Sequence, residues 1–194
     1  MVALSPEPRL TNRQTHLRDA LVEMVLVEGF SRLTMDQVAA RLNCSKRTLY
    51  ALAASKEQLA VLAVRHFFRR ATEQVEAAIA TIRSPARRVT GYLKAVAEAL
   101  RPASRAFRDD VAHFPPATEI YEQNTVAAAR RVRELIDEGT GAGAFRQVPA
   151  GFVGEVVTAT MRRITSGEIT AATGLSDAEA YTELARLVVA AIRR

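Results

Sequence analysis

The sequence contains a single cysteine, no tryptophan and no apolar run long enough to cross a membrane. One cysteine, Cys44, excludes a disulfide framework within the chain. A membrane-spanning helix needs about 20 apolar residues, so we expect no transmembrane segment. The first residues hold no long apolar core, so we also expect no signal peptide and a cytoplasmic protein.

The net charge of the chain is compatible with an acidic binding partner but does not require one. The chain has 194 residues, a net charge of +6 and 25% charged residues, a balance typical of folded chains. The basic excess is divided evenly between residues 1–56 and the remainder, so charge alone marks neither end as a nucleic-acid surface. The length suits a small domain followed by a larger one.

Residues that could form a catalytic or metal site are scattered. His16, His66 and His113 are far apart in the chain, and none has a second ligand at metal-site spacing. Asp109 and Asp110 lie within one helical turn of His113, which we interpret as the charged end of a helix rather than as a metal site. We therefore predict no enzyme, no metal and no cofactor.

The most specific pattern is a tight corner between two short helices. Thr34 and Gln37 have the spacing of a capping box at the start of a helix over Met35–Leu42. Asn43 is expected to end that helix, because Asn tolerates the left-handed backbone that a sharp corner needs. Ser45 is then positioned to cap the next helix.

That next helix, Lys46–Leu52, has the features of a helix that reads DNA. Leu49 and Leu52 fall on one side, so Arg47 and Ala51 point to the other. A helix in the major groove needs one buried stripe and one outward face that reaches base edges. Arg47 can donate two hydrogen bonds to guanine, worth roughly 1–3 kcal/mol of discrimination, and Ala51 can pack on a thymine methyl group.

From Arg13 to about Leu62 the chain resembles the DNA-binding domain of the tetracycline-repressor (TetR) family. The resemblance implies a helix-turn-helix over Thr34–Ala53 that binds double-stranded DNA. The residues that carry it are Gly29-Phe30, Thr34-Met35-x-x-Val38-Ala39, Ser45-Lys46-x-Thr48-Leu49-Tyr50 and Ser55-Lys56-Glu57-x-Leu59.

Three positions at the corner depart from the family. Asn43 stands where the family often has Gly, Cys44 where it has Val or Ile, and Ala53 where it usually has an aromatic residue. Ala53 lies where the helix over Lys46–Leu52 meets the next helix. Because its side chain is small, the tilt of the DNA-reading helix is not predicted. We interpret Cys44 as a small buried apolar residue rather than a redox sensor.

Several side chains in this region are expected to contact DNA. Lys46, Thr48 and Tyr50 can reach phosphates, and Lys56 lies at a further helix start, where free backbone N–H groups favour phosphate. The complete predicted DNA-binding set is Thr34, Ser45, Lys46, Arg47, Thr48, Tyr50, Ala51 and Lys56.

The fold class that we predict is all-α with about nine helices, since no strand pattern is convincing. An N-terminal arm and a three-helix helix-turn-helix domain occupy residues 1–62, and a larger helical ligand-binding and dimerisation domain occupies residues 63–194. At this end of the chain, Arg9 and Arg13 could contact the DNA backbone or a minor groove, although a disordered tail is the alternative. The other predicted helices cover residues 12–28, 55–82, 85–100, 103–112, 117–138, 150–173 and 177–193. The glycines of residues 139–143 are interpreted as a helix end and linker rather than a phosphate-binding loop.

The last two predicted helices carry apolar stripes with bundle spacing. The TetR resemblance implies that they form a four-helix bundle across a homodimer axis. The alternative is that the stripes are core within one chain. The candidate interface residues are Phe152, Val156, Tyr181, Leu184, Leu187, Val188 and Ile192.

A set of aromatic and polar residues within otherwise apolar helices is a candidate effector pocket. Each residue alone could equally be ordinary core, but together they suit a mostly apolar cavity with few polar groups. They are His66, Phe67, Tyr92, Phe107, His113, Phe114, Tyr121, Met161 and Arg162.

The sequence therefore predicts a homodimeric transcriptional repressor that binds a pseudo-palindromic operator and is released by a small apolar or amphipathic ligand. Two alternatives stay open at this point. One is a helical sensor or interaction protein whose corner motif only packs, and the other is an activator or ligand-independent regulator with the same fold.

Overall fold

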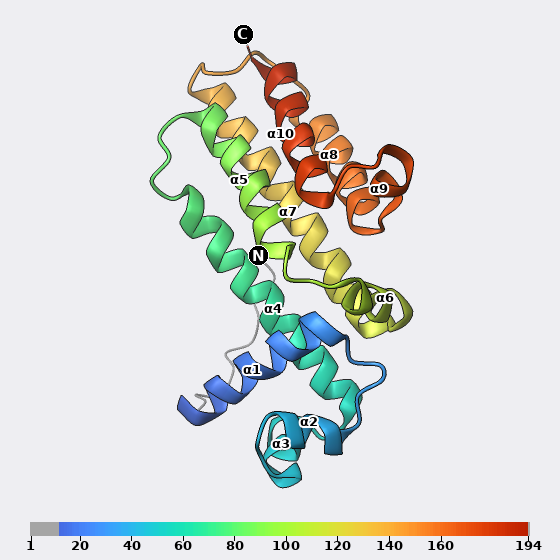
Figure 1. Ribbon diagram of the computed structural model, residues 1–194. Coiled ribbons are helices and arrows are strands. Elements are labelled where there is room, and N and C mark those ends of the chain that lie inside the picture. The colour runs from blue at the N-terminus through green and yellow to red at the C-terminus, as the bar shows by residue number, and fades with distance from the viewer. Residues whose placement is uncertain (1–11, 194) are drawn as a thin grey trace. The chain divides into compact units, whose positions relative to one another are not determined.

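The computed structural model describes residues 12–193, and these residues form an all-helical protein (Figure 1). Within that range there is no strand apart from one isolated bridge between Phe145 and Arg193, so the predicted fold class is confirmed. The predicted N-terminal arm lies outside the described residues. The helices are α1 Asn12–Glu28, α2 Met35–Arg41, α3 Lys46–Leu52, α4 Lys56–Ile79, α5 Pro85–Leu100, α6 Arg105–His113, α7 Pro115–Gly141, α8 Ala150–Thr165, α9 Glu168–Thr173 and α10 Asp177–Ile192.

Residues 150–173 form two helices where one was predicted, which explains why the described range holds one helix more than expected. α8 ends at Thr165, and α9 begins at Glu168. Gly167 lies between them with a φ of 78°. Glycine adopts this left-handed conformation without steric cost, and the turn interrupts the helix there.

The boundaries of α7 also differ from the prediction. Pro115 and Pro116 precede the helix predicted over residues 117–138, but in the structure they occupy the first turn of α7. Proline suits that position because its missing N–H would have no partner inside the helix. At the other end the helix extends to Gly141. Gly139 lies in this last turn, and a Cβ added to it would stand 2.2 Å from the Phe145 ring. The ring therefore occupies the space that a side chain at position 139 would need.

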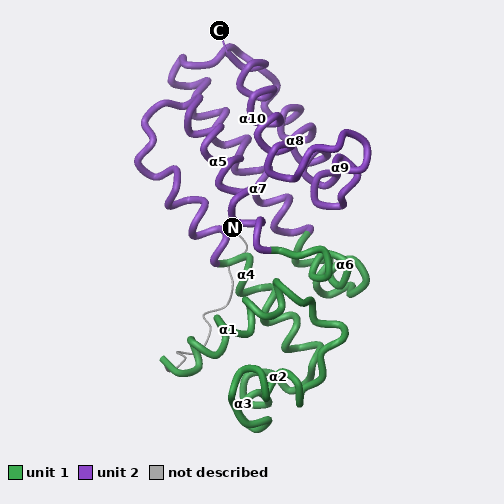
Figure 2. Tube along the Cα trace, viewed as in Figure 1, with its two compact units in different colours: residues 1–69, 103–121 green, residues 70–102, 122–194 purple. Residues whose placement is uncertain are grey.

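Contacts divide the chain into two compact units, shown in Figure 2. Unit 1 holds the described residues up to Arg69 together with residues 103–121, and unit 2 holds residues 70–102 and the residues from Glu122 onward. α4 and α7 each contribute residues to both units. Our functional division of the chain after Leu62 stays a prediction.

Unit 1 is built around large apolar side chains from α1, α3, α4 and α6. Leu21, Leu49 and Phe107 are fully buried, and burying one such side chain contributes roughly 1.5–3 kcal/mol. The Phe67 and Phe107 rings meet edge to face at 5.8 Å. These contacts fix α4 and α6 within the unit.

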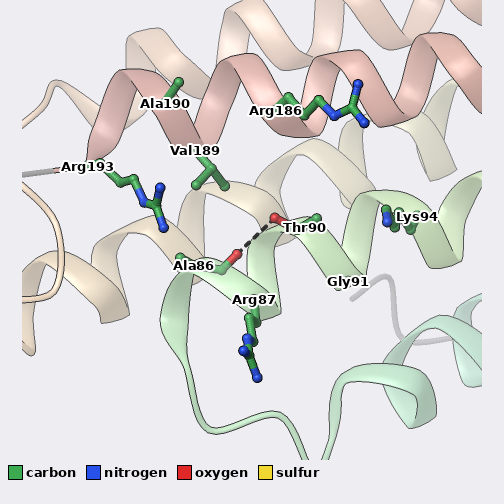
Figure 3. Close-up of a pocket in the computed structure, with 9 residues that line it drawn as sticks. All are labelled: Ala86, Arg87, Thr90, Gly91, Lys94, Arg186, Val189, Ala190 and Arg193. Carbon is green, nitrogen blue, oxygen red and sulfur yellow. Dashed lines mark hydrogen bonds between the residues drawn. The ribbon is translucent and has the colours of Figure 1, made fainter.

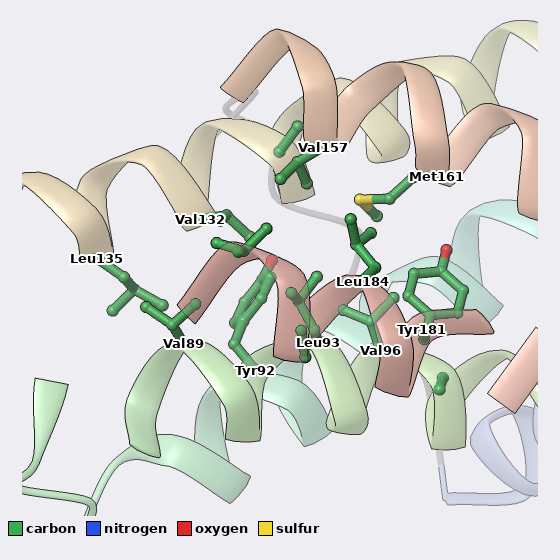
Figure 4. Packing of buried hydrophobic residues seen from close by; sticks show 14 of the residues in the cluster. Val89, Tyr92, Leu93, Val96, Val132, Leu135, Val157, Met161, Tyr181 and Leu184 are labelled. Atoms are coloured by element: carbon green, nitrogen blue, oxygen red, sulfur yellow. The ribbon is translucent and has the colours of Figure 1, made fainter. Parts of the chain in front are cut away.

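Unit 2 is a helical bundle in which α10 packs against α5 and α8. Figure 4 shows its apolar core, to which α5, α7, α8 and α10 contribute. Arg131 of α7 adds a polar tie, because its guanidinium bonds Glu76 of α4 at 3.0 Å and Glu138 at 3.3 Å. None of the helices within residues 12–193 combines the length and apolarity that a bilayer crossing requires.

Candidate nucleic-acid interface

The corner between α2 and α3 forms as its sequence predicts. The Thr34 hydroxyl accepts the Gln37 N–H at 3.2 Å, and the Gln37 side chain accepts the Thr34 N–H at 2.9 Å. This capping box begins α2 and is confirmed. Asn43 has a φ of 47°, the left-handed conformation predicted for it, and the chain turns there into α3.

Leu49 fixes how α3 is rotated about its own axis. The Ser45 hydroxyl caps the helix by accepting the Thr48 N–H at 3.1 Å. One turn further on, Leu49 is fully buried, and truncating such a leucine to alanine typically costs about 2–5 kcal/mol. With Leu49 held inward, the opposite side of α3 must face outward.

The outward face of α3 consists of Arg47, Tyr50 and Ala51. All three are exposed, and Tyr50 keeps 50% of its surface. Arg47 makes no hydrogen bond or ion pair with any residue that the structure describes. Its guanidinium therefore has all its N–H donors available for an external acceptor.

The remaining predicted contacts at the corner surround this face. Lys46 and Ser45 are exposed, and Thr48 is half-buried with its hydroxyl 2.8 Å from that of Ser45. The Lys46 ammonium lies 2.5 Å from the Asp36 carboxylate of α2. Because that ion pair is exposed it contributes little to stability, so a phosphate could compete for the lysine.

Lys56 has a second contact that sequence reasoning missed. It is half-buried at the start of α4, and its ammonium donates to the Ser31 carbonyl at 2.8 Å. The lysine therefore ties α4 to the turn after α1 within unit 1. An ammonium has three donors, so this bond leaves others for a phosphate.

Cys44 is half-buried beside the corner. Burial raises the pKa of its thiol, and the nearby Arg13 opposes this with a smaller effect. Because the thiolate is the reactive form, a raised pKa supports the interpretation of Cys44 as a small apolar residue.

Six of the predicted effector-pocket residues belong to unit 1. His66, Phe67 and Phe107 are buried, whereas His113 is exposed and Phe114 and Tyr121 are half-buried. His113 and Phe114 line a surface hollow of unit 1 that Lys56 and Asp110 also line.

His66 sits in a polar cluster of unit 1. Its Nε2 lies 2.6 Å from an Asp19 carboxylate oxygen, and its Nδ1 lies 2.7 Å from a guanidinium nitrogen of Arg69. A guanidinium only donates, so Nδ1 accepts and Nε2 carries the proton toward Asp19. Burial lowers the pKa of His66, although the hydrogen bond to Asp19 opposes this.

The other three predicted pocket residues belong to unit 2. Tyr92 and Met161 are buried in its core (Figure 4), and burial raises the pKa of the Tyr92 hydroxyl. Arg162 is exposed and its Nε donates to Glu122 at 2.9 Å. Tyr92 and Met161 therefore contribute to the packing of unit 2.

The predicted dimer residues divide into an exposed and a buried group. Phe152, Val156 and Leu187 keep 70%, 44% and 69% of their surface. The other members pack into the core of unit 2, where their side chains have no surface left for a partner chain, because the stripe of α10 faces α5 and α8. These buried residues are Tyr181, Leu184, Val188 and Ile192.

Within residues 12–193 no group of three or more His, Cys, Asp or Glu side chains is placed to hold a metal ion. In the Asp109, Asp110 and His113 cluster, His113 Nδ1 lies 2.6 Å from the Asp109 carbonyl oxygen. The Asp110 carboxylate accepts backbone N–H groups of the turn after α1. These groups thus serve the ends of helices.

Comparison with known proteins agrees with this geometry. Residues 17–63 match the profile of bacterial regulatory proteins of the tetR family. No curated protein sequence matches the chain.

Solved structures resemble the chain over nearly its whole length. A transcriptional regulator from Cytophaga hutchinsonii has a TM-score of 0.77 at 14% identity, covering 95% of this chain and 100% of its own. A TetR transcription regulator from Haloarcula marismortui has a TM-score of 0.74 at 16% identity, with coverage of 95% and 100%. A proposed transcriptional regulator from Saccharomonospora viridis, in complex with choline, has a TM-score of 0.74 at 15% identity, with coverage of 93% and 97%. At these identities the likeness shows the fold.

The fold and the corner motif define an all-helical protein with an N-terminal helix-turn-helix. The profile match assigns residues 17–63 to the DNA-binding region of bacterial regulatory proteins of the tetR family, and the solved structures share the all-helical fold of the chain.

Proposed function

We propose that this protein is a transcriptional repressor in the cytoplasm that binds a pseudo-palindromic operator as a homodimer and is released by a small apolar or amphipathic ligand. The observation that carries the proposal is the outward face of α3. There Arg47 is exposed without a partner in the described chain, beside Tyr50 and Ala51.

The chemistry of that face suits the major groove. Arg47 would read a guanine, and Ala51 would pack on a thymine methyl group. Lys46, Thr48 and Tyr50 would contact phosphates, which set the position of the helix without reading sequence. Apart from the half-buried Thr48, these side chains are exposed, which supports the assignment.

The homodimer is supported by exposed apolar side chains of unit 2. Phe152 and Val156 lie one turn apart on α8, and Leu187 lies on the neighbouring α10. Large exposed apolar groups mark interaction sites. A symmetric pair would place two recognition helices on half-sites about 34–36 Å apart.

The proposed effector is defined only by its class, a small apolar or amphipathic ligand. A similar fold from S. viridis is in complex with choline, which supports a small organic ligand. Such a ligand could release DNA only by binding two conformations with unequal affinity. α4 begins just after α3 and continues to Ile79, so a tilt of α4 would change how α3 is presented.

Selection of binding sites from a random duplex pool tests the proposal. The wild-type protein is expected to enrich a two-fold symmetric site. Arg47→Ala should weaken binding to that site roughly tenfold and relax one base position in each half. Arg83→Ala, which removes an exposed arginine of unit 2, is the charge-matched control. Equal affinity and base preference for Arg47→Ala would exclude the reading role, and failure to enrich any site would favour the interaction-protein alternative.

A further inference from the structure

A basic groove lies between α5 and α10 in unit 2 (Figure 3). We call it the α5/α10 groove. It contains Arg87 and Lys94 of α5 and Arg186 and Arg193 of α10. Its other lining residues are Ala86, Thr90, Gly91, Val189 and Ala190, so none of the lining residues is acidic.

The two helices present their cations with the same spacing. Arg87 and Lys94 are seven residues apart, and so are Arg186 and Arg193, which corresponds to about 10 Å along a helix. Figure 3 shows Arg193 beside the Ala86 end of the groove and Arg186 toward Lys94. Arg186 and Lys94 thus flank one end of the groove, and Arg193 lies at the other end, where Arg87 comes from α5 with its side chain directed away from α10 in this view.

Between these ends the floor is small and apolar. Val189 and Ala190 come from α10, and Ala86 and Gly91 come from α5. Thr90 is the uncharged polar side chain of the lining, but its hydroxyl donates to the Ala86 carbonyl at 3.1 Å. Recognition of an anion here would thus depend on the four cations.

The cations are available for a ligand. All four are exposed, and the side chains of Arg87, Lys94 and Arg193 make no hydrogen bond or ion pair with the described part of the chain. Arg186 pairs with Glu183 on the preceding turn, and its guanidinium keeps further donors. Four like charges around an apolar floor repel one another, and an anion would relieve that repulsion.

We propose that the α5/α10 groove binds an elongated small molecule with an anionic group at each end and an apolar middle. Guanidinium groups bind carboxylates and phosphates through paired hydrogen bonds, so either anion could form the ends. The groove has a volume of about 480 Å3, within the range of small-molecule sites. The site is independent of DNA binding by α3, and it is tested by direct binding.

Calorimetric titration with three probes tests the spacing of charges. Azelate carries two carboxylates on a long alkyl chain, nonanoate carries one on a chain of equal length, and succinate carries two on a short chain. The wild-type protein should bind azelate roughly tenfold more tightly than nonanoate or succinate. A parallel titration with hexamethylene bisphosphonate tells whether the groove favours carboxylate or phosphate ends.

A second experiment removes the cations that belong to the Ala86 end of the groove. The double variant Arg87→Gln, Arg193→Gln should lower azelate affinity roughly tenfold, to the level of nonanoate. Nonanoate should lose little, because it can use the other end. The double variant Arg101→Gln, Arg130→Gln removes two exposed arginines outside the groove and is the charge-matched control. Circular dichroism checks that each variant folds.

Three outcomes would overturn the proposal. Azelate could bind no more tightly than nonanoate, or the control double variant Arg101→Gln, Arg130→Gln could weaken azelate binding as much as the groove double variant does. The groove double variant could also lose affinity for duplex DNA of random sequence while azelate fails to bind the wild-type protein, which would assign the groove to a nucleic-acid backbone instead.

Discussion

The Asp110 carboxylate of α6 accepts a hydrogen bond from the backbone N–H of Ser31 at 2.8 Å. The same oxygen accepts the N–H of Phe30. Gly29 makes this approach feasible, because a Cβ there would stand 2.4 Å from that oxygen. Within unit 1, α6 is thereby tied to the turn that precedes the helix-turn-helix.

Asp110→Ala should destabilise the protein by about 1.5–3 kcal/mol, the usual range for hydrogen bonds to a charged group. Asp109→Ala is the neighbouring control, because that exposed carboxylate has only a loose contact to Arg105 at 3.7 Å and should cost little. Urea unfolding at neutral pH measures both. Equal stability of the two variants would show that the tie to Ser31 contributes nothing.

The Asp110 contribution should also depend on pH. Burial alone would raise the pKa of this carboxyl group, but the hydrogen bonds from Ser31 and Phe30 outweigh burial and lower it below 3.8. The stabilisation is therefore present above the unfolded-state pKa and is lost as pH falls through the lower folded-state pKa. The difference in unfolding free energy between wild type and Asp110→Ala should shrink below about pH 4.

His66 should make the protein less stable in mild acid. Burial, followed by the charges of Arg18 and Arg69, lowers the pKa of this histidine below 6.5, against the opposing effect of Asp19. The unfolded chain then takes up the proton first, so stability falls as pH drops below 6.5 and levels off below the folded-state pKa. The slope should reach at most about 1.4 kcal/mol per pH unit.

Unfolding midpoints between pH 7 and pH 5 check this expectation. His66→Gln should flatten the profile, whereas His16→Gln, at an exposed position of α1, should leave it unchanged. An identical slope in wild type and His66→Gln would assign the pH dependence to other groups.

Leu187→Glu should weaken the proposed dimer. The leucine is 69% exposed in the single chain, so the glutamate costs the monomer little, but burying its charge in an interface is unfavourable. Sedimentation velocity should show a dimer for the wild type and mainly monomer for the variant. Val27→Glu, at a 65% exposed position of α1, is the control, and a monomeric wild type would remove the homodimer from the account.

Lys56→Ala separates two roles of one side chain. If Lys56 contacts phosphate, its loss should weaken binding to all duplexes and reduce the slope of log affinity against log salt by about 1. If it only holds the Ser31 carbonyl, unfolding free energy should fall while the salt slope stays the same. An unchanged slope would take Lys56 out of the predicted DNA contacts.

The helix ends were predicted well where the capping and turn residues lie a few positions apart in the sequence. The predicted Thr34–Gln37 capping box forms, and Ser176 and Glu179 form a second one, because each depends on side chains one turn apart. Asn43 adopts the predicted left-handed turn for the same local reason. The break at Gly167 was missed, since a glycine inside an apolar helical pattern can be tolerated or can end the helix.

Contacts between distant residues could not be predicted in this way. The Asp110 tie joins residues about eighty positions apart, and sequence spacing carries no information on it. The apolar stripe of α10 was predicted as an interface, but which side of that helix faces the core depends on where α5 and α8 pack. The matched cation spacing of α5 and α10 was readable in the sequence, whereas their proximity was not.

Crosslinking from the outer face of α3 tests the central claim most directly. A protein with Cys44→Ser and Ala51→Cys carries its single thiol at an exposed position of α3, where a photoreactive label can be attached. The matched protein with Cys44→Ser and Ala142→Cys carries the label at an exposed position of unit 2. We predict that the label at position 51 crosslinks to bases within each half of the selected site and that the label at position 142 does not. A bound duplex that shows no base crosslinks from position 51 would contradict the assignment of α3 as the DNA-reading helix.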